Sequence, residues 1–352
     1  HLSIRRQRQM CIRDSYMTDS YGVVSGWVFG NDGYMGTAIT KRGNKKLTWE
    51  TTSEFNIGLD LGFFDNRISL SMEYYNRIIS DLLVSNKSLP AYNEINTIAA
   101  NIGKTQGRGF ELTLSTVNIM NKDWTWSTDF TFYTFKDNWY ERDPNWKPAA
   151  YESKKDPIRS YYSYVSDGLL QVGEKAPAWQ PTLVPGQIKL KNLYDTGTSP
   201  NVLDQYDKVN LGSQDPKCTL GLNNTLRYKN LDFNIYFYGE IGRLRGASYY
   251  DAWIVGLGNS LTNVSQQSLH SYTNANQNTT VPNLIESAYD FGDYYHKKIN
   301  YLRCRNITLG YTIPVSKSIA NSVRISANVS NPFVFTNWNG VDPETDTGNF
   351  SY

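Results

Sequence analysis

Four aromatic side chains in a long polar stretch are the residues of this chain best suited to contact a ligand: Tyr161, Tyr162, Tyr164 and Trp179. A flat apolar ring with a polar edge can stack on a sugar ring or on a peptide side chain. The same rings can instead pack a loop against its neighbours. The residue types favour neither use, so ligand contact and loop packing are two equally supported hypotheses for these side chains.

Catalytic residues are not evident. The three histidines, His1, His270 and His296, are far apart in the sequence and do not indicate a histidine-centred triad or a metal site. Asp129 and Glu73 could suggest a carboxylate pair, but both fall on the polar side of alternating segments, where carboxylates are ordinary lining of a barrel interior. We therefore expect a protein that is not an enzyme.

The elements that carry these residues are alternating segments joined in pairs by short turns. In residues 56–64 the apolar side chains of Ile57, Leu59, Leu61 and Phe63 alternate with polar residues or glycine, which predicts a strand with one apolar face. The predicted pairs are 56–64 with 68–74, 110–115 with 124–135, 220–228 with 231–238, and 301–311 with 323–329.

Long polar connections separate these pairs, over 76–108, 136–217 and 240–300. Strand-like pieces at 21–29 and 161–165 raise the expected total to about nine or ten strands. Strands of about nine to eleven residues, with short turns at one end and long loops at the other, are typical of an outer-membrane barrel. A long structureless loop would be unusual in a compact soluble domain.

Composition excludes several other classes. No apolar run approaches the roughly 18 residues that a membrane helix needs. The net charge of +2 argues against a nucleic-acid partner, which would require a concentrated basic face. Aromatic residues make up 14% of the chain and fit interfacial girdles, although tyrosine also favours strands generally. Cys218 and Cys304 are expected to be small apolar fillers.

Several segments resemble a known family when taken in order. They are residues 47–50, 55–60, 101–103, 108–111, 301–311, 331–333 and 340–344. As a set they are similar to the C-terminal barrel of SusC/RagA-type TonB-dependent transporters, from about Leu47 to Glu344. The resemblance implies an all-β fold, a fragment of a transmembrane antiparallel β-barrel of about 22 strands with long extracellular loops.

The same resemblance implies a domain assignment. Residues 16–352 would be a partial TonB-dependent receptor barrel, with the plug domain and the final strands absent from this sequence. Residues 1–15 are expected to be non-native, because the run from Arg5 to Ser15 resembles a translated sequencing adapter.

The function implied by the resemblance is active uptake of oligosaccharides or peptides across the outer membrane of a Gram-negative, Bacteroidota-type bacterium. The implied partners are a SusD-like surface lipoprotein, TonB through the missing N-terminal region, and outer-membrane lipid. Two alternatives stay open: a passive porin or adhesin-like barrel, and a soluble carbohydrate-binding β-sandwich.

A calcium site is a further expectation that comes from the resemblance. Asp195, Asp204 and Asp207 lie where similar proteins carry an Asp/Asn/Gly-rich loop that looks calcium-binding. Calcium takes six to eight oxygen ligands, whereas apolar and aromatic residues interrupt these carboxylates. A polar turn is therefore favoured, with structural calcium as the alternative and no other cofactor expected.

Overall fold

The computed structural model describes residues 15–30, 32–89, 97–145, 147–194, 201–246, 266–283, 291–315, 322–338 and 342–344. Almost all regular structure in these residues is β, as predicted. The strands are β1 Ser20–Phe29, β2 Asp32–Lys41, β3 Thr51–Phe63, β4 Ile68–Ser80, β5 Leu83–Ser88, β6 Thr97–Asn101, β7 Lys104–Met120, β8 Trp124–Glu141, β9 Ser160–Ser163, β10 Ser166–Leu169, β11 Ile188–Leu190, β12 Val209–Ser213, β13 Cys218–Tyr228, β14 Leu231–Gly246, β15 His296–Ile313 and β16 Val323–Thr336. Two short 3-10 helices, η1 Gln205–Asp207 and η2 Gln266–His270, complete the set.

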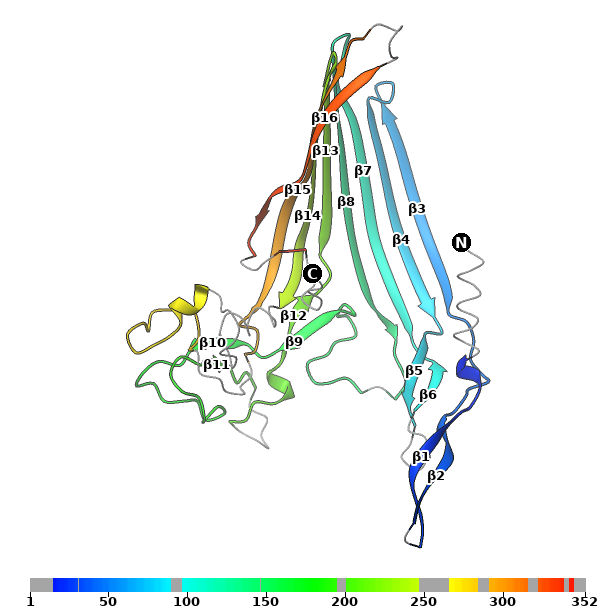
Figure 1. The fold of residues 1–352 in the computed structure, drawn as a ribbon, viewed down its shortest axis with the longest axis vertical. Helices are drawn as coiled ribbons and strands as arrows, with labels where there is room; N and C mark the ends of the chain where they lie inside the picture. Colours follow the sequence, from blue (N-terminus) through cyan, green and yellow to red (C-terminus); the bar gives the residue numbers. More distant parts are fainter. Residues whose placement is uncertain are drawn as a thin grey trace. The chain divides into compact units, whose positions relative to one another are not determined.

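The eight long strands form one sheet in the order β16-β15-β14-β13-β8-β7-β4-β3 (Figure 1). This order follows the chain, so each long strand lies beside the next one in sequence. The registers of β8 with β13, and of β13 through β16, are antiparallel throughout. The four predicted strand pairs are therefore confirmed as neighbours, and the pairs themselves join into a single meander.

The strand boundaries predicted from alternation were too short. β4 continues to Ser80, β8 to Glu141 and β14 to Gly246, while β7 begins at Lys104 and β15 at His296. These extensions carry polar residues on both faces, which hides the period-two signal although the backbone pairing continues. The connections are correspondingly shorter than predicted, and they contain the small two-stranded sheets β5–β6, β10–β11 and β9–β12.

Short turns at one end of the sheet follow from local side-chain chemistry. Phe64, Asp65 and Asn66 have φ of 55°, 57° and 61° between β3 and β4, and Asn residues tolerate this left-handed region well. Between β7 and β8 the side chain of Asn121 accepts hydrogen bonds from the backbone N–H of Asp123 (3.1 Å) and Trp124 (2.8 Å). These turns reverse the chain without consuming long loops.

A β-bulge interrupts β15 at Arg305. Cys304 and Asn306 are register neighbours of Phe237 and Tyr236, so Arg305 has no direct partner on β14. The bulge shifts the alternation by one residue: Leu302 and Cys304 precede it on the same face that Ile307 occupies after it. Without this extra residue, the second half of β15 would present its apolar side chains to the opposite face.

The chain divides into two compact units. The first comprises His1–Asn56, Tyr75–Arg108 and Asp137–Lys147. Within it, Asn101 links three segments: its side chain donates to the carbonyl oxygens of Thr48 (3.0 Å) and Asp81 (2.7 Å) and accepts from the Thr48 N–H (2.8 Å). An ion pair between Lys104 and Glu141 (2.8 Å) joins β7 to β8.

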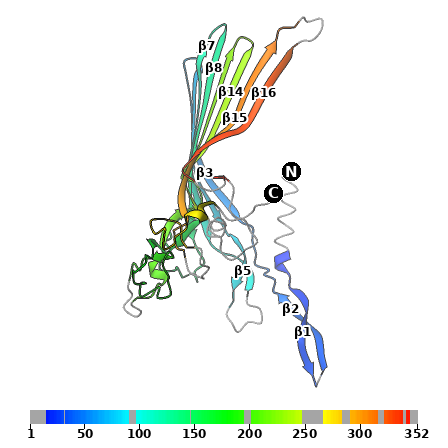
Figure 2. The same cartoon turned by 60° about the vertical axis from the view of Figure 1, so that its left-hand side comes forward.

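The second unit comprises Ile57–Tyr74, Gly109–Lys136 and Pro148–Tyr352. In it, β14, β15 and β16 run side by side, and the short strands β9 to β12 gather at the end of these strands that is opposite the short turns (Figures 1 and 2). Its buried core is a cluster of Leu169, Ile188, Leu190 and Tyr272 beneath the loops. No helix among the described residues is long and apolar enough to cross a membrane.

Candidate functional site

One face of the sheet in the second unit is apolar and exposed. The register sets Leu222 of β13 opposite Phe237 of β14, and Phe233 of β14 opposite Leu309 of β15. On β16 the same face carries Ile325, Val329 and Phe335, which are 65%, 54% and 63% exposed. A contiguous apolar surface of this extent requires an apolar neighbour, because soluble monomers rarely expose patches beyond a few hundred Å².

The opposite face carries a hydrogen-bonded polar network that crosses four strands. Ser115 of β7 donates to Asp129 of β8 (2.8 Å), and Asn223 of β13 donates to the other Asp129 oxygen (3.4 Å). Asn234 of β14 donates in turn to Asn223 (2.7 Å) and Thr225 (3.0 Å). Asp129 is thus an acceptor within the lining, as its place on the polar side of its strand predicted.

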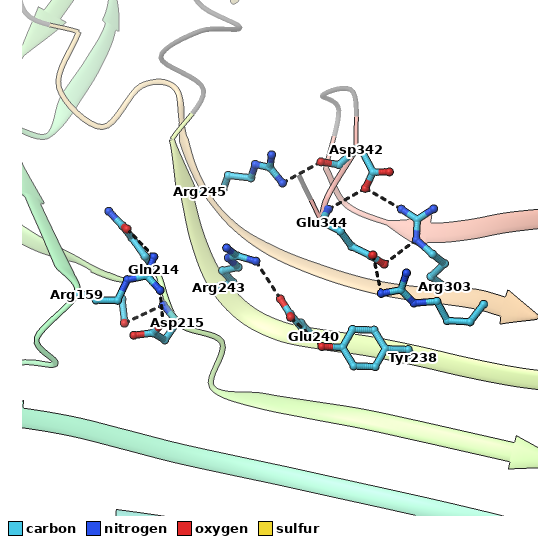
Figure 3. Close-up of polar contacts among 12 residues, drawn as sticks. Arg159, Gln214, Asp215, Tyr238, Glu240, Arg243, Arg245, Arg303, Asp342 and Glu344 are labelled. Atoms are coloured by element: carbon cyan, nitrogen blue, oxygen red, sulfur yellow. Dashed lines mark hydrogen bonds and ion pairs between the residues drawn. The ribbon is translucent and has the colours of Figure 1, made fainter. Parts of the chain in front are cut away.

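A charged cluster continues this face toward the loop end of β14 (Figure 3). The hydroxyl of Tyr238 donates to Glu240 (3.0 Å), whose second oxygen lies 3.4 Å from Arg243. The ring of Tyr301 on β15 lies 6.2 Å from that of Tyr238, and Tyr301 is only 5% exposed. The arrangement offers hydroxyl and charged groups for binding polar molecules.

Two of the four predicted ligand-contact residues lie beside other side chains in the loops. The Tyr162 hydroxyl donates to Asp156 (2.7 Å), and its ring lies 5.1 Å from that of Tyr151. Burial, and then the hydrogen bond to Asp156, raise the pKa of Tyr162 above its ordinary value. Tyr164 packs against the buried cluster beneath the loops, and the Lys208 ammonium lies 5.2 Å from its ring centre.

The other two also have partners. The indole N–H of Trp179 donates to the carbonyl oxygen of Leu190 (2.7 Å), which ties it to β11. Tyr161 stacks on His296, with ring centres 4.4 Å apart and an angle of 23°, yet it remains 37% exposed. The structure therefore gives all four residues a packing or hydrogen-bonding role, and ligand contact stays a prediction for which Tyr161 has the most accessible ring.

Two of the predicted calcium residues, Asp204 and Asp207, fall in a tight turn. Asp207 is fully buried; one carboxylate oxygen accepts from the N–H groups of Leu193 (2.6 Å) and Tyr194 (3.0 Å), and the other accepts from the N–H of Asp204 (2.9 Å). Asp204 caps η1 by accepting from the Tyr206 N–H (2.8 Å). Backbone donors thus occupy oxygens that a cation would need.

The third predicted ligand, Asp195, lies outside the described residues. Within those that are described, no group of three or more His, Cys, Asp or Glu side chains could hold a metal ion. Asp204 and Asp207 alone do not meet the oxygen count that calcium requires. A calcium site here stays a prediction that depends on residues beyond this turn.

Sequence reasoning missed the ion pairs on the polar face. Arg303 and Arg305 of β15 contact Asp342 and Glu344, about forty positions further along the chain (Figure 3). Nothing in the local pattern indicates which acids these arginines meet, because the contact depends on the register of β15 and on the path of the chain after β16.

Comparison with known proteins assigns this architecture. A family model described as "TonB dependent receptor-like, beta-barrel" matches residues 15–331. The TonB-dependent receptor P3 of Formosa agariphila is 29% identical over 339 residues, covering 92% of this chain and 33% of that protein. The TonB-dependent receptor SusC of Bacteroides thetaiotaomicron is 28% identical over 330 residues, covering 90% of this chain and 32% of that protein.

A solved structure of the RagAB peptide importer in its open-open state has the same fold. It superposes with a TM-score of 0.72 at 21% identity, over 92% of this chain and 35% of that chain. A second RagAB peptide transporter structure gives a TM-score of 0.70 at 22% identity, over 92% of this chain and 36% of that chain. The chain spans about a third of the length of the curated relatives it matches.

Proposed function

The chain belongs to the family of TonB-dependent receptor-like β-barrels, and we propose that it forms part of the wall of an outer-membrane transporter that takes up oligosaccharides or peptides. The family match over residues 15–331 and the similarity to SusC confirm the resemblance to TonB-dependent transporters of the SusC/RagA type. One observation carries the proposal: a single antiparallel meander has a continuous apolar face and a hydrogen-bonded polar face. That pattern suits a sheet with lipid on one side and water on the other.

In this function the wall makes and breaks no bond. The apolar rows on β13 to β16 contact hydrocarbon, and closed strand pairing satisfies the backbone groups that lipid cannot. The polar face, with Asp129, Asn223 and Asn234 in the middle and Tyr238 and Glu240 nearer the loops, lines the interior. The loops that pack around the buried cluster of Leu169, Ile188, Leu190 and Tyr272 lie at the extracellular opening of the barrel.

Energy and partners come from outside this chain. We propose that TonB drives transport through another part of the protein, and that a SusD-like lipoprotein covers the loop end. Support comes from two similar proteins: one is named SusC, and a solved structure is titled as the RagAB peptide importer. The relatives from Formosa and Bacteroides favour the outer membrane of a Bacteroidota-type bacterium.

The substrate class is proposed as oligosaccharide or peptide. The loops present tyrosine rings, of which Tyr161 is the most accessible of the predicted contacts, and such rings suit both sugar faces and peptide side chains. Tyr161→Ala in the full-length gene product should weaken ligand binding, whereas Trp179→Ala should act through loop stability, because Trp179 donates to the Leu190 backbone.

The test is uptake by cells that lack or carry the full-length gene. Cells are given fluorescent oligosaccharides or peptides, with and without a protonophore that removes the energy source of TonB. Uptake that needs both the gene and the proton gradient supports active transport. Uptake that needs the gene but survives the protonophore indicates a passive porin, and recovery of the protein as a detergent-independent soluble species indicates the sandwich alternative.

A further inference from the structure

The chain that leaves β16 is anchored to the loop end of β15. The side chain of Asn337 accepts from the N–H of Asn300 (2.9 Å) and donates to the carbonyl oxygen of Lys298 (3.2 Å). The Lys297 ammonium donates to the Asn337 carbonyl oxygen (2.6 Å). These bonds continue the pairing of β15 with β16 beyond Thr336 through side chains.

A few residues after Asn337, the chain carries two carboxylates, and both bind arginines of β15 (Figure 3). Arg303 donates through Nε to one oxygen of Glu344 (2.6 Å) and through Nη2 to Asp342 (2.8 Å). Arg305 lies 2.7 Å from the second Glu344 oxygen. The Glu344 carboxylate is therefore held between two guanidinium groups, one oxygen to each, and charge-assisted bonds of this kind are about twice as strong as neutral ones.

A third arginine, on β14, contacts both parts of this segment. Arg245 donates to the carbonyl oxygen of Asp342 (2.8 Å), and its guanidinium carbon lies 5.2 Å from the centre of the Trp338 ring. Arg245 is only 7% exposed, and Pro343 is buried. The segment thus packs on the sheet and does not merely touch it by two surface charges.

The bulge and the aromatic neighbours set the arginines in place. Arg305 is the extra residue of the β15 bulge, and its guanidinium lies 5.0 Å from the ring centre of Tyr238 on β14. Arg303 is register partner to the same Tyr238, so both arginines share the polar face. Two cations this close repel each other unless an anion lies between them, and Glu344 supplies it.

We propose that Asn337, Trp338 and Asp342–Glu344 form a strap, and that Arg303 and Arg305 are a carboxylate-binding site whose resident ligand is this strap. The strap lies against the polar face of β14 and β15. Because charge pairs close it, losing one charge releases it while the backbone ladder of the sheet stays intact. The strap does not depend on transport by the protein.

The test measures release of the strap in the full-length gene product, purified in detergent. Pro343→Cys supplies a reporter at a buried position, and its reaction with a maleimide is followed by mass spectrometry of the peptide that contains residue 343. Adding Arg303→Gln should raise the labelling rate at least about tenfold. The substitution removes the charge-assisted hydrogen bonds from Arg303 to Asp342 and to Glu344. Arg303→Lys keeps the positive charge but loses the planar guanidinium that binds two carboxylates at once, so it should give an intermediate rate.

Arg324→Gln is the matched control, since it removes another arginine–carboxylate pair from the polar face, far from the strap in the register. It should leave labelling of residue 343 unchanged. Equal rates in the parent and in Arg303→Gln, or an equal rise in Arg324→Gln, would overturn the strap. Should Arg303→Gln fail to fold, Arg305→Gln replaces it, because Arg305 is more exposed, at 36% of its side chain.

A second readout needs no cysteine. The N–H of Glu344 donates to the Asp342 oxygen that Arg303 also contacts (2.8 Å in each case), so its hydrogen exchange reports whether Arg303 holds that oxygen in place in the native sequence. Exchange should accelerate in Glu344→Gln and in Arg303→Gln and stay slow in Arg324→Gln. Slow exchange in all variants would contradict the proposal. Transport is measured in neither readout, so a failure of the strap and a failure of the transport proposal are separable.

Discussion

Asp232 of β14 and Arg324 of β16 form an ion pair across an intervening strand. Arg324 Nε lies 3.0 Å from Asp232 Oδ1, and Nη2 contacts the other oxygen, so the pair is bidentate. Between them lies Gly310 of β15, the direct register partner of Asp232. A Cβ at position 310 would sit 2.6 Å from Asp232 Oδ2. The glycine is what lets two strands that are not neighbours share a salt bridge.

Gly310→Ala should therefore cost stability only through this pair. The groups that the new Cβ would meet are the ends of the Asp232 and Arg324 side chains, which are flexible and can swing aside, and an exposed ion pair contributes little to stability. In a variant with both Asp232→Ala and Arg324→Ala, Gly310→Ala should cost nothing further. The measurement is the heat-modification midpoint of the full-length barrel in detergent, in a double-mutant-cycle format. Identical effects of Gly310→Ala in both backgrounds would show that the glycine serves another purpose.

Charge on the apolar row of β3 should block barrel assembly. Arg or Lys at the bilayer midplane costs about 2 to 4 kcal/mol, so Leu59→Arg should sharply lower the yield of heat-modifiable barrel. Gly58→Arg is the matched control: it points to the other face, and a Cβ there meets nothing closer than 3.8 Å. Equal losses of barrel in the two variants, measured by gel shift of outer membranes, would reverse the assignment of lipid and interior faces.

Short turns and long loops should lie on opposite sides of the membrane. An epitope tag inserted at Asp167 or Asn276 should bind antibody on intact cells, because alternate connections of an antiparallel barrel share one side. A tag at Asp65 or Asn230, in the short turns, should bind only after the outer membrane is opened. Binding of both sets on intact cells would contradict the meander.

Asp207→Asn should loosen the turn around η1 while the sheet survives. The carboxylate accepts three backbone N–H groups, and an amide would point a donor at some of them, at a cost of about 1 to 3 kcal/mol for a buried unsatisfied group. Limited proteolysis should then cut near Tyr194 and Tyr206 earlier than in the parent. Asp204→Asn is the control, since Asn is an equally good N-cap. Equally early cleavage in Asp204→Asn would contradict the prediction that the Asp207 carboxylate holds the turn.

Calcium provides a second arm of that experiment. If backbone donors alone hold the turn, proteolysis of the parent should be the same in calcium and in a chelator. Protection that appears only with calcium would instead support a metal site that includes Asp195.

Alternation is a local property of the chain, and through it the sequence by itself determines much of this architecture. Ile57, Leu59, Leu61 and Phe63 share a face because a pleated strand repeats every two residues. The strand pairs followed from short turns such as Asn121 to Asp123, whose side chains close the reversal themselves. The resemblance to the family is likewise visible in the sequence, because it is carried by short local segments that occur in the family's order.

Contacts between distant residues were decided only by the tertiary structure. That Glu344 lies between Arg303 and Arg305, and that Asp232 meets Arg324, depends on strand register and on the path of the chain beyond β16. Alternation does not specify these offsets. The bulge at Arg305 changes the register offset by one residue. Where both faces of a strand end are polar, the end shows no period-two alternation, so its boundary cannot be predicted from the sequence. The loop tyrosines show the same division: their residue type allows stacking on a ligand or on a neighbour, and only the folded loops pair Tyr162 with Asp156 and Tyr161 with His296.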